Sequence, residues 1–193
     1  MSIRNFAAYG HSSRPDQSSG ILADNAQSIT IDSVNLAQFD RGLWTTGTCT
    51  TCYFEQLQVA ANRYGIIVHG MQTATFQNTI FENNLTCALI IARLNGWPTH
   101  AISFLNPYFE GGNVREPTIS IGPATHVSIE NPLFDSGLIR WDNSSWCRLL
   151  FPALAAGDGL SVPFPADRLI RNGLIDCYVM GVAGLPDGRF LAP

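Results

Sequence analysis

The sequence predicts an all-β fold in which short strands wind into a solenoid of about six coils. A seven-residue pattern, apolar-x-Asn-x-apolar-Phe-acid, occurs at 76–82 (FQNTIFE), 104–110 (FLNPYFE) and 129–135 (IENPLFD). Looser copies begin at Ile3, Ile31 and Phe54. The six starts lie between 22 and 28 residues apart, and a period of this size made of short apolar runs and turns is typical of stacked repeats.

Composition agrees with a packed and weakly charged chain. Of the 193 residues, 13% are charged and 46% are hydrophobic, which is the opposite of what disorder requires. The formal net charge of −4 argues against a nucleic-acid partner, since nucleic-acid binding needs clustered Lys and Arg. The sequence contains no lysine, so a lysine base or Schiff base is excluded.

Each copy of the pattern is expected to begin a strand. Apolar and polar residues alternate over a few positions, as in a half-buried strand. In the copy at 76–82, we expect Phe76, Asn78 and Ile80 to share one face and Phe81 to begin a new direction. The repeat is too short for a crossover helix and lacks a helical apolar stripe, so successive coils should pair in parallel, about 4.8 Å apart.

A second short apolar run follows each copy and predicts a second strand per coil. These runs lie at 20–22, 42–44, 65–68, 88–91, 118–121 and 137–139. Variation in coil length should fall in loops rich in Gly, Ser, Thr, Asn and Pro. The candidate loops are 10–19, 45–51, 94–99 and 111–116.

The recurring asparagine predicts a tight bend with a stacked side chain. Asparagine tolerates left-handed backbone angles, and its amide can donate to one neighbouring coil and accept from the other. Asn78, Asn106 and Asn131 would form three rungs of such a ladder. A column of Phe81, Phe109 and Phe134 should stack inside the core.

Together, the asparagine and phenylalanine columns resemble those of the right-handed parallel β-helix, the pectate-lyase-like superfamily that includes many bacteriophage tailspikes. The resemblance covers about residues 1–143 and is one of pattern, not of a single diagnostic motif. It implies a surface-polysaccharide partner and, from the phage members, a homotrimer.

The chain is expected to divide near residue 145. Residues 1–144 would form the parallel β-helix, and 145–193 a small β-rich cap or assembly segment with several Pro and Gly residues. Because Ile3 already belongs to a coil, we expect either a fragment of a longer chain or a partner that covers this end. No signal peptide is seen, so we expect synthesis in the cytoplasm. The resemblance implies action on a virion tail or outside the cell.

An acidic column is the most direct candidate for catalysis. Glu82, Glu110 and Asp135 each follow a phenylalanine of the column, and Asp40 follows Phe39. Carboxylates on neighbouring coils would approach the separation used by retaining glycosidases. Carboxylates with one coil between them would fall in the range of inverting glycosidases. The alternative is structural, since an acid at the end of a strand can accept hydrogen bonds from turn amides.

Aromatic and arginine residues are candidates for substrate binding. Arg140 and Trp141 lie together after an apolar run, where a guanidinium could hold an acidic sugar beside an indole face. Trp97, on a loop, and Tyr108 could be sugar platforms. Arg140 and Trp141 could instead lie at a junction between subdomains or chains, and Trp97 could be a lid over the apolar interior.

No cofactor and no metal ion are expected. The four histidines do not share a position in the repeat, and the CxxC of Cys49 and Cys52 lacks the second pair of a zinc site. No Asp-x-Asp-Asp cluster is present for calcium. No apolar run has the length to span a bilayer, so membrane insertion is not expected.

The leading hypothesis is a tailspike-like module, possibly a fragment, that recognises host surface polysaccharide and packs as three copies side by side. A second hypothesis is a polysaccharide-degrading glycoside hydrolase or lyase that uses the acidic column. A third is a purely structural segment of a virion or surface assembly.

Overall fold

A computed structural model describes most of the first 141 residues and a few short strands beyond them. The described residues are 1–11, 18–93, 96–110, 118–134, 137–141, 148–150, 153–154, 160–161 and 178–180, with side chains described up to residue 134. Within these ranges the chain forms strands, turns and bends and contains no helix. Accordingly, no helix that could cross a membrane is found in this part of the chain.

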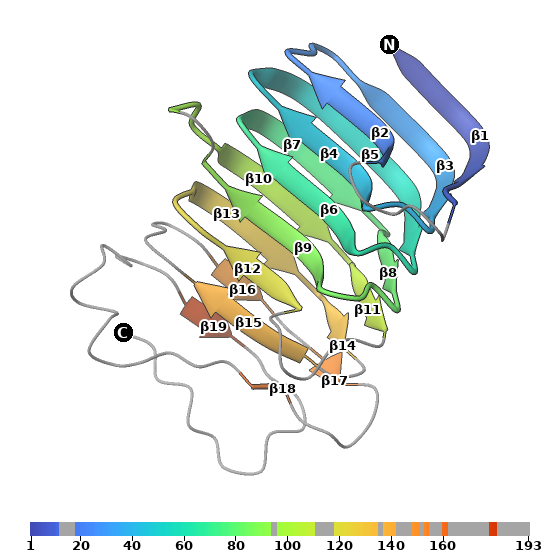
Figure 1. Ribbon diagram of the computed structural model, residues 1–193. Coiled ribbons are helices and arrows are strands. Elements are labelled where there is room, and N and C mark those ends of the chain that lie inside the picture. Colours follow the sequence, from blue (N-terminus) through green and yellow to red (C-terminus); the bar gives the residue numbers. More distant parts are fainter. Residues whose placement is uncertain are drawn as a thin grey trace.

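The described strands form two sheets in which neighbouring strands run parallel (Figure 1). One sheet has seven strands: β2 (Ser19–Asp24), β4 (Arg41–Thr46), β6 (Tyr64–His69), β9 (Cys87–Ala92), β12 (Ile119–Ile121), β15 (Gly137–Trp141) and β18 (Leu160–Ser161). The other has twelve strands and two arms that meet at β5. This confirms the prediction of an all-β fold with parallel pairing.

On one side, β5 pairs with β3 along residues 53–60; on its other side it pairs with β7 through residues 49–55 and with β8 through residues 58–60. The path through β3, β5 and β7 contains β1 (Ser2–Tyr9), β3 (Thr30–Ala37), β5 (Cys49–Ala60), β7 (Met71–Gln77), β10 (His100–Leu105), β13 (Thr125–Glu130), β16 (Arg148–Leu150) and β19 (Tyr178–Met180). The second arm contains β8 (Ile80–Glu82), β11 (Tyr108–Glu110), β14 (Leu133–Phe134) and β17 (Ala153–Leu154).

The register follows the repeat that the sequence displays. Each repeat start is the Cα partner of the next, in the order Ile3, Ile31, Phe54, Phe76, Phe104 and Ile129. The same column continues to Leu149 and Val179, so the sheet extends past residue 145. Because side chains of parallel strands in register stack on one another, equal positions of successive repeats form columns.

Left-handed backbone recurs in these columns and bends each repeat at the same place. One column contains Asn5, Ser33, Gln56, Asn78, Asn106 and Asn131, with φ between 50° and 56°. A second contains Thr51, Thr73, Ala101 and His126, with φ between 55° and 61°. Non-glycine residues adopt such angles rarely, so their alignment shows that each corner is fixed by the stack.

The bend at Asn78 corrects one expectation about side-chain direction. Phe76 is fully buried and Phe81 is buried, but Ile80 is 38% exposed and Thr79 is buried instead. A left-handed residue interrupts the simple alternation of a strand, because it turns the backbone at that point. Phe76 and Ile80 therefore lie on opposite sides of the sheet, not on one face.

Two columns of phenylalanine rings stack in the core between the sheets. Phe81, Phe109 and Phe134 stack with ring centroids 4.6 and 4.9 Å apart, as the sequence predicts. A second stack, not foreseen, joins Phe54, Phe76 and Phe104 at 4.2 and 4.3 Å. All these rings are at most 1% exposed, so both columns bury large apolar surfaces and stabilise the stack of strands.

Candidate functional site

A groove of about 360 Å³ follows the bend of the first three strands of the 12-stranded sheet. Its lining residues are Asn5, Phe6 and Ala7 of β1, Ser33, Val34 and Asn35 of β3, and Gln56 and Gln58 of β5. The left-handed residues Asn5, Ser33 and Gln56 turn each strand at this corner. The groove is thus built by the column that further along the chain contains Asn78, Asn106 and Asn131.

Side-chain amides and a hydroxyl give the groove its polar character. Ser33 Oγ donates to Gln56 Oε1 at 2.9 Å, and Asn35 Nδ2 donates to Gln58 Oε1 at 3.0 Å. None of the eight lining residues is charged. Amides and hydroxyls both donate and accept, so this surface suits a ligand rich in hydroxyl groups more than an ion.

Phe6 adds an exposed aromatic surface to the groove. It is 48% exposed, whereas Val34 and Leu57, the next residues of its column, are 1% and 0% exposed, so Phe6 stands at the end of a core column. A few precisely spaced polar groups beside an apolar surface are the usual composition of a small-molecule site. A sugar ring could place its C–H face on Phe6 and its hydroxyls against the amides.

The acidic residues Glu82 and Glu110 lie next to the groove and next to each other. They are Cα partners on β8 and β11, and both side chains are half-buried. Gln58 Nε2 donates to Glu82 Oε2 at 2.9 Å, which links this pair to the groove. Backbones of paired strands lie about 4.8 Å apart, so the two carboxylates belong to neighbouring strands on one face of the sheet.

Tyr108 shares the outer face of β11 with Glu110, because Phe109 between them points into the core. The Cα partners of Tyr108 are Ile80 and Leu133, which are each 38% exposed. Tyr108 therefore belongs to an outward column of large side chains beside the acid pair. The structure brings together three of the residues expected from the sequence: Glu82, Glu110 and Tyr108.

Asp40 does not lie in the acidic column. The residues in register with Glu82 are Ala60 and, one strand further, Ala37, so Asp40 follows the column by three residues. The Phe39–Asp40 pair matches the motif only in composition, since the register is set by Ile31 and Phe54. Asp40 is 3% exposed, unlike the half-buried Glu82 and Glu110.

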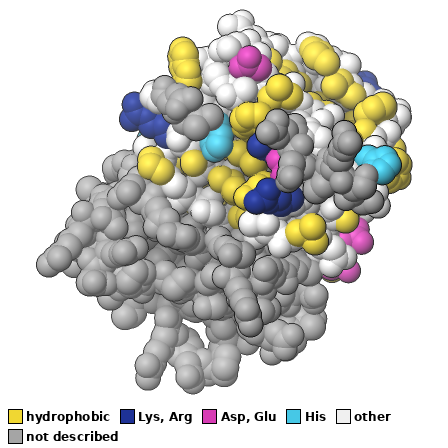
Figure 2. Space-filling view, viewed as in Figure 1, with side chains coloured by type: hydrophobic (Ala, Val, Ile, Leu, Met, Phe, Trp, Pro, Cys, Tyr) yellow, Lys and Arg dark blue, Asp and Glu magenta, His cyan; other side chains and the backbone are white. Residues whose placement is uncertain are grey.

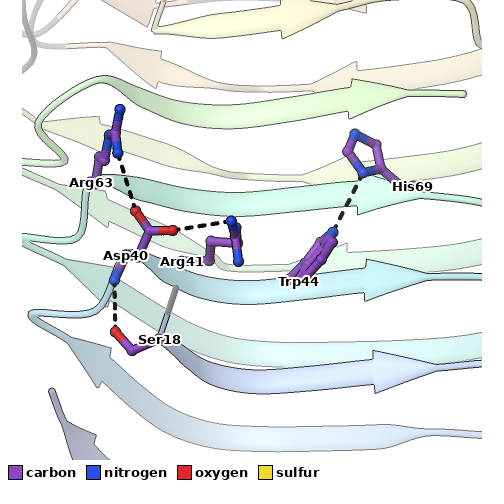
Figure 3. A network of polar contacts seen from close by, with 6 residues as sticks. All are labelled: Ser18, Asp40, Arg41, Trp44, Arg63 and His69. Carbon is purple, nitrogen blue, oxygen red and sulfur yellow. Dashed lines mark hydrogen bonds and ion pairs between the residues drawn. The ribbon is translucent and has the colours of Figure 1, made fainter. Parts of the chain in front are cut away.

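Asp40 instead belongs to a polar network beside the 7-stranded sheet (Figure 3). Its carboxylate lies 3.2 Å from Arg41 Nη2 and 3.6 Å from Arg63 Nη1, and its backbone N–H donates to Ser18 Oγ at 3.1 Å. A buried carboxylate requires such compensation. These contacts join three successive repeats, which is the behaviour of a structural ion pair.

The same network contains Trp44 and His69. The Arg41 guanidinium lies 4.4 Å from the centre of the Trp44 ring, and Trp44 Nε1 donates to His69 Nδ1 at 3.4 Å. Burial, and then the charge of Arg41, lower the pKa of His69 below its usual 6.5, so the neutral ring that accepts from Trp44 is favoured. Figure 2 shows hydrophobic side chains interspersed with a few charged ones over this sheet.

The remaining candidates do not join the groove. Trp97 is 47% exposed and its Cβ lies near Gly70, at a different corner of the repeat. Arg140 and Trp141 lie on β15 of the 7-stranded sheet, in register with Ser120 and Ile121, and their side chains are outside the described residues. Asp135 is also outside the described residues.

The three asparagines expected to form a ladder are joined by hydrogen bonds. Asn106 Nδ2 donates to Asn78 Oδ1, and Asn131 Nδ2 donates to Asn106 Oδ1, both at 3.2 Å. All three have φ of 51° or 52°. The repeat places them on the rim beyond the groove, in the column of Asn5, Ser33 and Gln56.

Most groove residues were not singled out by sequence reasoning. Gln56 and Ser33 occupy the asparagine position of looser repeats, and this shared position is the signal that could have found them. Asn35 and Gln58 are polar residues on half-buried strands and carry no distinctive motif. Their importance arises only from register, which aligns Asn35 with Gln58 and with Ala7.

No group of three or more His, Cys, Asp or Glu suited to hold a metal ion occurs among the described residues. Comparison of the chain with protein-family models, curated proteins and solved structures finds no match.

Proposed function

We propose that the chain forms a right-handed parallel β-helix of about six coils and acts as a tailspike-like module that recognises a surface polysaccharide. The groove between β1, β3 and β5 would be the binding surface, and three copies would pack side by side. In support of the β-helix, one constant register joins six successive repeats that bend at aligned left-handed residues.

One observation carries the proposed function: the groove combines uncharged amide and hydroxyl side chains with the half-exposed ring of Phe6. A polysaccharide offers hydroxyls along its edges and C–H groups on its ring faces. The amides of Asn5, Asn35, Gln56 and Gln58 would take the hydroxyls, and Phe6 would take the ring. A neutral or mildly acidic polysaccharide fits this surface best.

The test is retention of bacterial surface polysaccharides on an array by purified protein and two variants. Phe6→Ala should reduce retention at least about tenfold, as expected when a buried aromatic contact is lost. Tyr9→Ala is the matched control, because Tyr9 is on the same strand, is 67% exposed and does not line the groove. Equal retention by the two variants would count against binding in the groove. Light scattering of the same samples tests the oligomeric state, for which we expect a trimer.

A second candidate function is cleavage of the polysaccharide, and the register pairing of Glu82 with Glu110 favours it. If the pair cuts a glycosidic bond, Glu110→Gln should abolish the release of reducing ends from retained polysaccharide and leave the thermal melting temperature unchanged. Retention without release by the unmodified protein would assign the chain to recognition alone. Absence of any retention would favour a purely structural segment.

A further inference from the structure

We propose that Glu82 is a positioning residue that sets the direction of a hydrogen-bonded amide chain along the groove. The chain runs from Asn35 Nδ2 to Gln58 Oε1 at 3.0 Å, and from Gln58 Nε2 to Glu82 Oε2 at 2.9 Å. Both donors point toward Glu82. The three residues come from β3, β5 and β8, so the chain crosses three successive repeats.

The direction follows from the chemistry of the terminal group. A side-chain amide is symmetric in shape and can present either its oxygen or its nitrogen, but an ionised carboxylate only accepts. Glu82 therefore requires the amino group of Gln58, which turns the oxygen of Gln58 toward Asn35. Asn35 must then present its own amino group, and its oxygen faces the opposite way.

The other end of the chain shows the result of this direction. Asn35 Oδ1 is buried and has no hydrogen-bond partner. The Cα partner of Asn35 on the next strand is Ala7, whose methyl group can neither donate nor accept. The chain therefore ends in an acceptor, beneath the part of the groove that Ala7 lines.

A fixed direction determines the pattern that the groove offers to a ligand. Each amide uses one N–H in the chain, so the second N–H of Asn35 and of Gln58 stays on the Glu82 side, and each carbonyl oxygen stays on the Ala7 side. A saccharide hydroxyl row would meet the free N–H groups and the Gln58 oxygen in one order only, because Asn35 Oδ1 is buried. The ligand in this inference rests on the proposed function, whereas the direction of the chain does not.

The test reverses the direction of the amide chain and detects the change at Asn35, the end farthest from Glu82. In Glu82→Lys the new ammonium can only donate, so the oxygen of Gln58 should turn toward it and the amino group of Asn35 toward Ala7. The original protein should then be stabilised by a donor at position 7 (Ala7→Lys), and Glu82→Lys by an acceptor there (Ala7→Asp). In each background, the variant predicted to form the new hydrogen bond should have an unfolding equilibrium constant about fivefold smaller than the other, the size of one hydrogen bond. Urea denaturation measures both.

A control separates this effect from direct attraction between the introduced charges. Positions 7 and 82 are at least about 14 Å apart, three strand spacings, and salt screens exposed charges beyond about 8 Å at 0.15 M. Gln58→Met interrupts the chain without removing either charge. The reversal should disappear in Gln58→Met, and a reversal that persists there, or is absent in the original background, overturns the proposal.

The polysaccharide array then tests the consequence for the groove. Glu82→Lys should retain a different set of polysaccharides from the unmodified protein, and an identical set overturns the specificity role. If the unmodified protein retains none, the proposed function fails, but the denaturation result stands by itself. Failure of one inference is thus distinguishable from failure of the other.

Discussion

The side chain of Asn106 donates a hydrogen bond to Asn78 Oδ1 at 3.2 Å, and both residues have left-handed backbone with φ of 51° and 52°. The side chain and the backbone of one residue type thus meet two requirements at the same corner. Asparagine tolerates this backbone better than other non-glycine residues, and its amide both donates and accepts.

Replacement of Asn106 should separate these two contributions. Asn106→Ala loses the hydrogen bonds and adds backbone strain, so we expect a loss of about 1–2 kcal/mol in the free energy of unfolding. Asn106→Gly loses the same bonds but accepts the left-handed backbone, so its loss should be smaller. Urea denaturation measures both, and equal losses would contradict a role for backbone strain.

Phe76 should be among the most sensitive core residues, because it is the middle ring of a three-ring stack. Its centroid lies 4.2 Å from that of Phe54 and 4.3 Å from that of Phe104. Phe76→Ala should cost about 3–5 kcal/mol of unfolding free energy, and Phe76→Leu clearly less. A loss below about 1 kcal/mol for Phe76→Ala, the size expected of an ordinary surface change, would argue that the stack does not form.

Asp40 should contribute to stability and not to any chemistry of the groove. Asp40→Asn removes the charge that faces Arg41 and Arg63, and we expect a loss of about 1–3 kcal/mol, below the full value for a buried pair because both arginines are partly exposed. The exposed Asp24 provides the matched control, Asp24→Asn, which should change stability little. Unchanged stability in Asp40→Asn, with altered polysaccharide retention, would contradict the structural assignment.

His69 should make stability depend on pH. Its pKa in the folded chain lies below the usual 6.5, mainly because burial disfavours the charged ring. The unfolded state therefore binds the proton more readily. The contribution of His69 to the free energy of unfolding is fully present above pH 6.5 and is lost as the pH drops through the folded pKa. His69→Gln keeps an acceptor for Trp44 Nε1, and its denaturation midpoint should fall less than that of the original protein between pH 7.5 and pH 5.

The fold could be predicted from the sequence because its signal is repeated in register. The apolar residue that begins each copy marks a column that the sheets preserve from Ile3 to Ile129. A periodic pattern of this kind reports on strands and on the columns they form. The phenylalanines at the end of each copy gave the Phe81–Phe109–Phe134 stack for the same reason.

The corners could not be predicted equally well, because left-handed backbone is shared by residues that have little else in common. Thr51, Thr73, Ala101 and His126 occupy one such column, and only stacking explains why Ala101 adopts it. Simple alternation places Ile80 on the same side as Phe76, and this is wrong because the turn at Asn78 shifts the alternation. Local composition does not record a bend that neighbouring strands impose.

The candidate site was only partly visible for a related reason. Glu82 and Glu110 stand out because acids follow a repeated phenylalanine, and the structure places them side by side. Asp40 carries the same local signature but lies out of register. The groove amides of Asn35 and Gln58, which are joined by a hydrogen bond, carry no distinctive motif in the sequence.

The 12-residue strand β5 fixes the position of the groove corner relative to the acid pair. Its first half is paired with β7 and its second half with β8, so the groove corner and the acid pair inherit their relative alignment from one uninterrupted stretch of backbone. One residue inserted in β5 between 55 and 58 would move the β5 side chains that follow it to the opposite face of the sheet. Gln58 would then face the core and lose its hydrogen bond to Glu82, and the groove would no longer be linked to the acid pair.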